Sequence, residues 1–160
     1  MILGLEGGFG ATRPIFLIGP FSTAGLLSSD RIDAVELRVW CTVANPDPVW
    51  SVHAMIRTPS LLRGFDWNHF SSPDGHWHEA GAGGLGTDIY ATPLSTGIGL
   101  TQGWNTICSG ADLVALVSTR RRARIGLLML CAEGAPRSYI DGEGEAHPPG
   151  VIVNYTREMR

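Results

Sequence analysis

Polar and apolar residues alternate most regularly between residues 34 and 43. The apolar set is Val35, Leu37, Val39, Cys41 and Val43, and the set between them is Glu36, Arg38, Trp40 and Thr42. Because neighbouring side chains of a strand point to opposite faces, this segment predicts a β-strand with one face in the core. Trp40 falls on the wetter face, where it is either covered by the segment 65–92 or available to stack on a ligand.

Several shorter apolar runs are bounded by glycine or proline and predict further strands. They span residues 14–18, 50–56, 104–108, 125–132 and 151–155. We expect the run 50–56 to return antiparallel to the run 34–43, and the run 125–132 to be a central strand buried on both faces. Residues 112–117 predict at most one turn of helix. Many short strands separated by turns are typical of an all-β antiparallel sandwich.

The segment 65–92 is too long for a plain connection. It contains Trp67 and Trp77, three histidines and a glycine-rich turn. Connections of this length usually form functional loops or are packed down by their own side chains. Because tryptophan has a large apolar surface, we expect Trp67 and Trp77 to hold the loop against one face of a sheet.

The length of 160 residues fits a single domain. We divide it into an N-terminal arm over residues 1–13, a sandwich over residues 14–156 and a C-terminal tail over residues 157–160. The short arm is expected to leave a sheet edge open, and open edges accept strands from neighbouring molecules. We therefore expect a homo-oligomer.

The charge of the chain is low. Charged residues make up 17% of the sequence, hydrophobic residues 44%, and the net charge is −3. A sparsely charged surface favours coverage by a partner or by further copies. The negative net charge favours neither nucleic acid nor anionic membranes as partners. The arginine-rich segment 119–124 is interpreted as a solvated hairpin tip, with a docking patch for an acidic neighbour as the alternative.

No stretch predicts a membrane span or an export signal. The apolar runs are too short to cross a bilayer, and the N-terminus has no cationic start. We expect synthesis in a cytoplasm and no membrane insertion. The three cysteines, Cys41, Cys108 and Cys131, lie in apolar runs without metal-binding spacing and are expected to be buried free thiols.

Motifs for catalysis are missing from the sequence. Glu143 and Glu145 are too close in sequence to be assumed to face each other across a cleft, and no G-x-S-x-G motif occurs. The glycine-rich run 81–86 lacks the lysine of a phosphate-binding loop. We expect no enzyme activity and assign no catalytic residue.

Aromatic side chains are the candidate ligand platforms, because the faces of sugar rings pack on aromatic rings. We select Trp40, Trp67, Trp77 and Tyr90 as candidate glycan-binding residues. Trp50 and Trp104 complete the set of large aromatic candidates, and most of this set must serve as core.

An ordered series of short segments resembles the DNRLRE domain family. The series comprises Trp67-Asn68, Trp77 with residues 79–82, residues 86–89, 91–94, 103–106, 111–117, 126–130, 138–139, 143–145, 148–149 and 151–156. The resemblance extends from about residue 13 to residue 156, and its specificity lies in the order of the segments. It implies a jelly-roll β-sandwich similar to carbohydrate-binding modules.

Members of this family are appendages of secreted enzymes and adhesins or small standalone proteins of tailed phages. The resemblance thus implies a bacteriophage virion surface protein, as a head decoration, head fibre or tail-associated protein. Expected partners are further copies, other virion proteins and host-surface polysaccharide. Alternatives are a free-standing extracellular carbohydrate-binding module and a calcium-stabilised fragment of a larger enzyme.

Similar jelly-roll modules often hold structural calcium. Asp141, Glu143 and Glu145 offer oxygen ligands for such an ion. They lack the spacing of an EF-hand loop, and hydrated carboxylates at a turn are the alternative interpretation.

Overall fold

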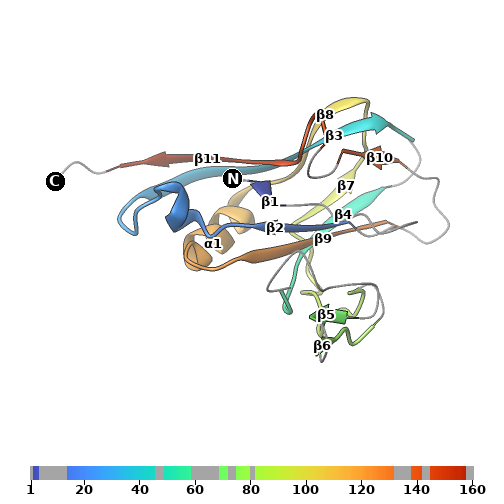
Figure 1. Ribbon diagram of the computed structural model, residues 1–160, viewed down its shortest axis with the longest axis horizontal. Coiled ribbons are helices and arrows are strands. Elements are labelled where there is room, and N and C mark those ends of the chain that lie inside the picture. The colour runs from blue at the N-terminus through green and yellow to red at the C-terminus, as the bar shows by residue number, and fades with distance from the viewer. Residues whose placement is uncertain are drawn as a thin grey trace.

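In the part of the chain that the structure describes, the protein is a β-sandwich of two antiparallel sheets with one α-helix (Figure 1). The computed structural model describes residues 2–3, 14–45, 49–58, 69–71, 75–79, 82–131, 138–141 and 145–157. The prediction of an all-β antiparallel sandwich is confirmed.

The first sheet contains five strands in the order β1-β2-β9-β4-β7. These are β1 (Ile2–Leu3), β2 (Ile15–Ile18), β9 (Ile125–Cys131), β4 (Trp50–Ala54) and β7 (Ser95–Ile98). Strand β9 lies between β2 and β4, and its first five residues are buried. The predicted central strand is therefore confirmed.

The second sheet is organised around the long strand β3 (Arg31–Val43). Strands β10 (Tyr139–Ile140) and β11 (Gly150–Thr156) pair with β3, as does β8 (Gly103–Ser109). The alternation predicted for β3 is observed from Val35 to Cys41. Val43, the last residue of β3, is 55% exposed.

Strand β4 does not pair with β3, in contrast to the predicted antiparallel return. Strand β4 lies in the first sheet between β7 and β9, whereas β3 lies in the second sheet. The chain therefore changes sheet between these two strands. Their apolar faces meet across the core, which buries both more completely than a two-stranded pair could.

The helix α1 (Ala111–Arg120) is longer than the single turn predicted from the sequence. Leu113 and Val117, four residues apart, are both fully buried, and this spacing places them on one face of the helix. Helix α1 packs against β3 and β8 and lies near one end of the two sheets (Figure 1). A short 3-10 helix, η1 (Phe21–Ala24), follows β2.

The arginine-rich segment is not a hairpin tip. Its first residues end α1, and the remainder leads into β9. Arg121 donates hydrogen bonds to the backbone carbonyl oxygens of Leu27 and Asp30. At least this arginine therefore ties the helix end to the segment before β3.

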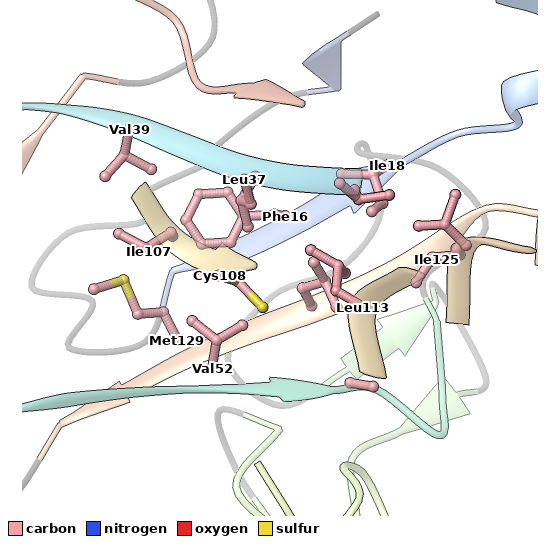
Figure 2. Close-up of a cluster of buried hydrophobic side chains, with 14 of the residues drawn as sticks. Phe16, Ile18, Leu37, Val39, Val52, Ile107, Cys108, Leu113, Ile125 and Met129 are labelled. Carbon is pink, nitrogen blue, oxygen red and sulfur yellow. The ribbon is translucent and has the colours of Figure 1, made fainter. Parts of the chain in front are cut away.

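The main core fills the space between the two sheets. Figure 2 shows Phe16, Leu37, Val52, Ile107 and Met129 converging from five different strands. A side chain from α1, Leu113, joins the same cluster.

A second, smaller core lies on the outer face of the first sheet. Ile15, Leu17, Met55 and Leu128 come from the sheet and its margin, and Trp77, Ala82 and Ile89 come from the loop that covers it. Trp77 is only 5% exposed. The prediction that this tryptophan holds the loop on a sheet is confirmed, and the hairpin of β5 (His69–Ser71) and β6 (Gly75–His76) lies in the same loop.

The ends of the chain contribute to the sandwich. Strand β1 pairs with β2 through Ile2 opposite Ile18 and Leu3 opposite Leu17, so part of the expected open edge is covered. At the other end Arg157, assigned to the tail, binds the Asp30 carboxylate.

In the described residues, no helix has the length and apolar character needed to cross a membrane. Cys41 and Cys108 are buried and Cys131 is half-buried, and these three cysteines are not joined in disulfide bonds. Burial raises the pKa of the Cys108 thiol to about 12.

Candidate binding patch on the outer sheet face

Two tryptophans from neighbouring strands meet on the outer face of the second sheet. Trp40 of β3 and Trp104 of β8 stand directly opposite each other in the strand register. Their ring centroids are 5.6 Å apart, with the rings at 81° in an edge-to-face arrangement. Trp40 lies between the buried Val39 and Cys41, and Trp104 precedes the buried Asn105, so both rings point away from the core. Trp104 is 44% exposed.

His147 completes this cluster from the segment between β10 and β11. Its ring stacks on Trp40 with centroids 4.0 Å apart and an angle of 16°, and it meets the Trp104 ring in a T-shaped arrangement with centroids 6.3 Å apart. The ring is held by Asp141, whose carboxylate lies 3.2 Å from His147 Nδ1. The backbone N–H of Asp141 in turn donates to the Trp40 carbonyl oxygen at 2.9 Å.

Arg38 borders the cluster on β3. Its guanidinium carbon lies 5.8 Å from the centroid of the Trp104 ring, a cation–π distance. We call Arg38, Trp40, Trp104, Asp141 and His147 the outer aromatic patch.

A buried amide fixes the entry of the chain into β8, next to Trp104. The Asn105 side chain accepts the backbone N–H of Thr101 at 2.9 Å and donates to the carbonyl oxygens of Thr101 and Gly103. Gly103 has a φ of 103°, which favours glycine. The hydrogen bonds of the Asn105 side chain therefore fix the backbone at the start of the strand that carries Trp104.

The candidate glycan-binding residues lie in different parts of the molecule. Trp40 belongs to the patch, covered by His147 and Trp104, whereas the described part of the segment 65–92 packs on the other sheet. Trp67 lies outside the described residues. Trp77 is buried beneath the loop and offers no exposed ring face.

Tyr90 is 42% exposed but lies outside the outer aromatic patch. Its carbonyl oxygen is 2.9 Å from His53 Nδ1, and its hydroxyl accepts a hydrogen bond from Arg120 at 3.1 Å. Its backbone N–H donates to Ala54, so it stands beside the first sheet.

The three candidate calcium ligands do not form a described metal site. Asp141 is engaged by His147, Glu145 is exposed, and Glu143 lies outside the described residues. No group of three or more histidine, cysteine or acidic side chains that could hold a metal ion occurs among the residues described. Because Ca²⁺ takes six to eight oxygen ligands and residues 142–144 lie outside the described part of the chain, the calcium site stays a prediction, and we derive no role from this ion.

A fully buried carboxylate has a structural role elsewhere. Asp88 accepts backbone N–H groups of His78, Glu79 and Gly84 at 2.9 to 3.2 Å. Arg57 lies 3.9 Å from it. Asp88 therefore holds the loop over the first sheet and faces no solvent.

The sequence pattern ranked Trp104 too low and did not point to Arg38 or His147 as ligand-binding residues. Trp104 stands in a predicted strand. Its position beside Trp40, however, depends on the pairing of two strands in which these residues are more than 60 positions apart in the sequence. His147 lies in an irregular segment, so the spacing of polar and apolar residues does not predict the direction of its side chain.

Comparisons of the chain with protein-family models, curated proteins and solved structures find no match. We therefore argue function from the geometry and chemistry of the patch.

Proposed function

We propose that this protein is a non-catalytic adhesion module that binds polysaccharide through the outer aromatic patch. The observation that carries the proposal is the exposed Trp104 beside Trp40 and His147 on the outward face of a sheet. Aromatic rings offer apolar faces to the C–H groups of a sugar ring. The nearby guanidinium and carboxylate supply hydrogen-bonding groups for sugar hydroxyls.

The arrangement of the patch favours binding over catalysis. His147 uses its ring face on Trp40 and its Nδ1 on Asp141. Within the described residues, no hydroxyl or thiol contacts this histidine as a nucleophile would.

The setting that we propose is the surface of a bacteriophage virion, as a head decoration, head fibre or tail-associated protein. Its support is the resemblance to the DNRLRE family and the low charge of the chain. The strands β2, β3 and β4, and again β7, β8 and β9, alternate between the two sheets, which supports the jelly-roll form of the sandwich. A free-standing carbohydrate-binding module is the alternative with the same binding chemistry.

Removal of the Trp104 ring tests the binding proposal. We expect Trp104→Ala to weaken polysaccharide binding at least about fivefold, because about 1 kcal/mol or more of ring contact is lost. Binding to host-surface polysaccharide is measured by affinity electrophoresis, and thermal melting establishes that the variant is folded. Loss of the cross-strand pair alone lowers stability by about 1 kcal/mol or less.

The matched comparison is Tyr90→Ala, which removes an exposed aromatic ring outside the patch. We expect this variant to bind like the wild type. Unchanged binding by folded Trp104→Ala, or a selective loss in Tyr90→Ala, would place the site elsewhere and contradict the proposal.

A further inference from the structure

Arg38 has no ion-pair partner among the described residues, in contrast to two other arginines. Arg157 binds Asp30 at 2.9 Å and Arg31 binds Asp33 at 2.8 Å. In the described part of the chain, no carboxylate oxygen lies within 4.0 Å of a guanidinium nitrogen of Arg38, and its Nε is buried without a hydrogen-bond partner. No described acidic side chain therefore pairs with this guanidinium, so its charge is left for an external acceptor.

The two acidic side chains nearest in the strand pattern have partners of their own. Glu36, two residues before Arg38 on the same face, accepts a hydrogen bond from Thr106 at 3.5 Å. Asp141 is held by His147. The positive charge of Arg38 is therefore not neutralised by an ion pair on this face, within the residues that the structure describes.

The neighbours of Arg38 leave room for a ligand. Gly150 of β11 stands opposite Arg38 in the register and has no side chain, and Thr106 of β8 is small. On the remaining side the guanidinium lies over the Trp104 ring. A sugar that packs on Trp104 would bring its substituents next to Arg38.

We infer that the outer aromatic patch binds an acidic sugar and that Arg38 recognises its carboxylate. This inference rests on the proposed polysaccharide binding and adds the class of sugar. A guanidinium presents parallel N–H donors that match the two oxygens of a carboxylate, and because Nε is buried, the terminal Nη groups make this contact. Charge on the sugar thus supplies affinity and the indole supplies the stacking surface.

The test is a glycan array of neutral, carboxylated and sulfated glycans, probed with the wild type, Arg38→Gln and Arg122→Gln. Arg122 is exposed in the connection between α1 and β9, so its variant carries the same change in net charge away from the patch. We expect carboxylated glycans to be preferred by the wild type and by Arg122→Gln. In Arg38→Gln, binding of these glycans should fall at least about tenfold, while any binding to neutral glycans persists.

Calorimetric titration of the best carboxylated glycan and of its methyl ester then isolates the carboxylate. We expect the ester to bind the wild type as weakly as the acid binds Arg38→Gln. Arg38→Lys keeps the charge but not the paired donors, and we expect intermediate affinity. In addition, affinity for the acid should fall with added salt.

The outcomes separate the inference from the proposed function. Preference for neutral or sulfated glycans, or full affinity in Arg38→Gln, would overturn the acidic-sugar inference while leaving polysaccharide binding intact. Absence of glycan binding altogether would overturn both.

Discussion

The carboxylate of Asp30 binds the side chain of Arg157, the residue that follows strand β11. Arg157 donates Nε to one carboxylate oxygen at 3.0 Å and Nη2 to the other at 2.9 Å. The backbone N–H of Leu27 adds a third hydrogen bond at 2.8 Å. The hydrogen bond from Arg157 is the main reason that the pKa of Asp30 lies below its ordinary value of 3.8.

This pKa shift predicts how stability depends on pH. Between the lowered pKa of folded Asp30 and 3.8, the unfolded chain binds more protons, so stability falls as the pH drops through this range. We expect Arg157→Gln to be less stable than the wild type at pH 7. The difference should shrink as the pH falls below 3.8 and Asp30 becomes protonated.

Urea unfolding midpoints at pH 7, 5, 4 and 3 measure the effect. Arg122→Gln removes an exposed arginine from the connection before β9 and serves as the control, with no comparable dependence on pH. A stability difference for Arg157→Gln that stays constant down to pH 3 would show that Arg157 does not affect the ionisation of Asp30.

At the level of elements, helix α1 begins in an unusual way. Its N-cap residue, Gly110, has φ 109° and ψ −178° and makes no side-chain hydrogen bond. This backbone region is accessible almost only to glycine. The tight connection from β8 to α1 therefore depends on a glycine, which has no side chain that could cap the helix.

We expect Gly110→Ser to destabilise the protein, although serine is a favoured N-cap residue. Backbone strain costs about 1 to 3 kcal/mol, whereas serine exceeds glycine as a cap by only a few tenths of a kcal/mol. Apart from the adjoining backbone, no described atom lies within 4 Å of a Cβ added at position 110, so overlap with other described parts of the chain does not add to the strain.

Thermal and urea unfolding measure the change, with Gly99→Ser as the matched control. Gly99 also has open space around its Cβ but has no positive φ, so this control should be close to neutral. Equal or greater stability of Gly110→Ser would show that the helix start relaxes without strain.

For the whole molecule, strand β11 presents the feature that most favours assembly. Residues 150–156 carry no charged side chain, and Ile152 and Tyr155 are 39% and 46% exposed. Strand β11 pairs only with β3 among the described strands and runs along the margin of the molecule (Figure 1). Uncharged edge strands readily pair with another chain.

We expect light scattering to give a homo-oligomer with the same mass in calcium and in chelator. Ile152→Lys should lower the mass towards that of a monomer, because a charge on an edge strand opposes pairing. Val49→Lys, at a position 63% exposed outside the strands, is the control and should leave the mass unchanged.

A wild-type monomer would contradict the oligomer and favour the free-standing carbohydrate-binding module. A mass or melting temperature that falls in chelator would instead indicate a bound calcium ion.

Local features whose cause lies within a few residues could be predicted from the amino-acid sequence alone. The alternation of polar and apolar residues predicted β3, and a continuous apolar run predicted β9. The large apolar surface of Trp77 predicted that this residue anchors a loop. These predictions hold because burial on one or both faces leaves a period in the sequence itself. The helix was underestimated, since only Leu113 and Val117 of its ten residues are fully buried.

Which strands pair and which side chains meet depends on the packing of the whole fold. Strand β4 joined the first sheet instead of β3, and the register of β3 with β8 brought Trp40 beside Trp104. The same packing buried Trp77 and left Trp104 exposed. Strand pairing is a long-range choice that depends on how both sheets cover one core, so a local pattern could predict the strands but not the patch that they build.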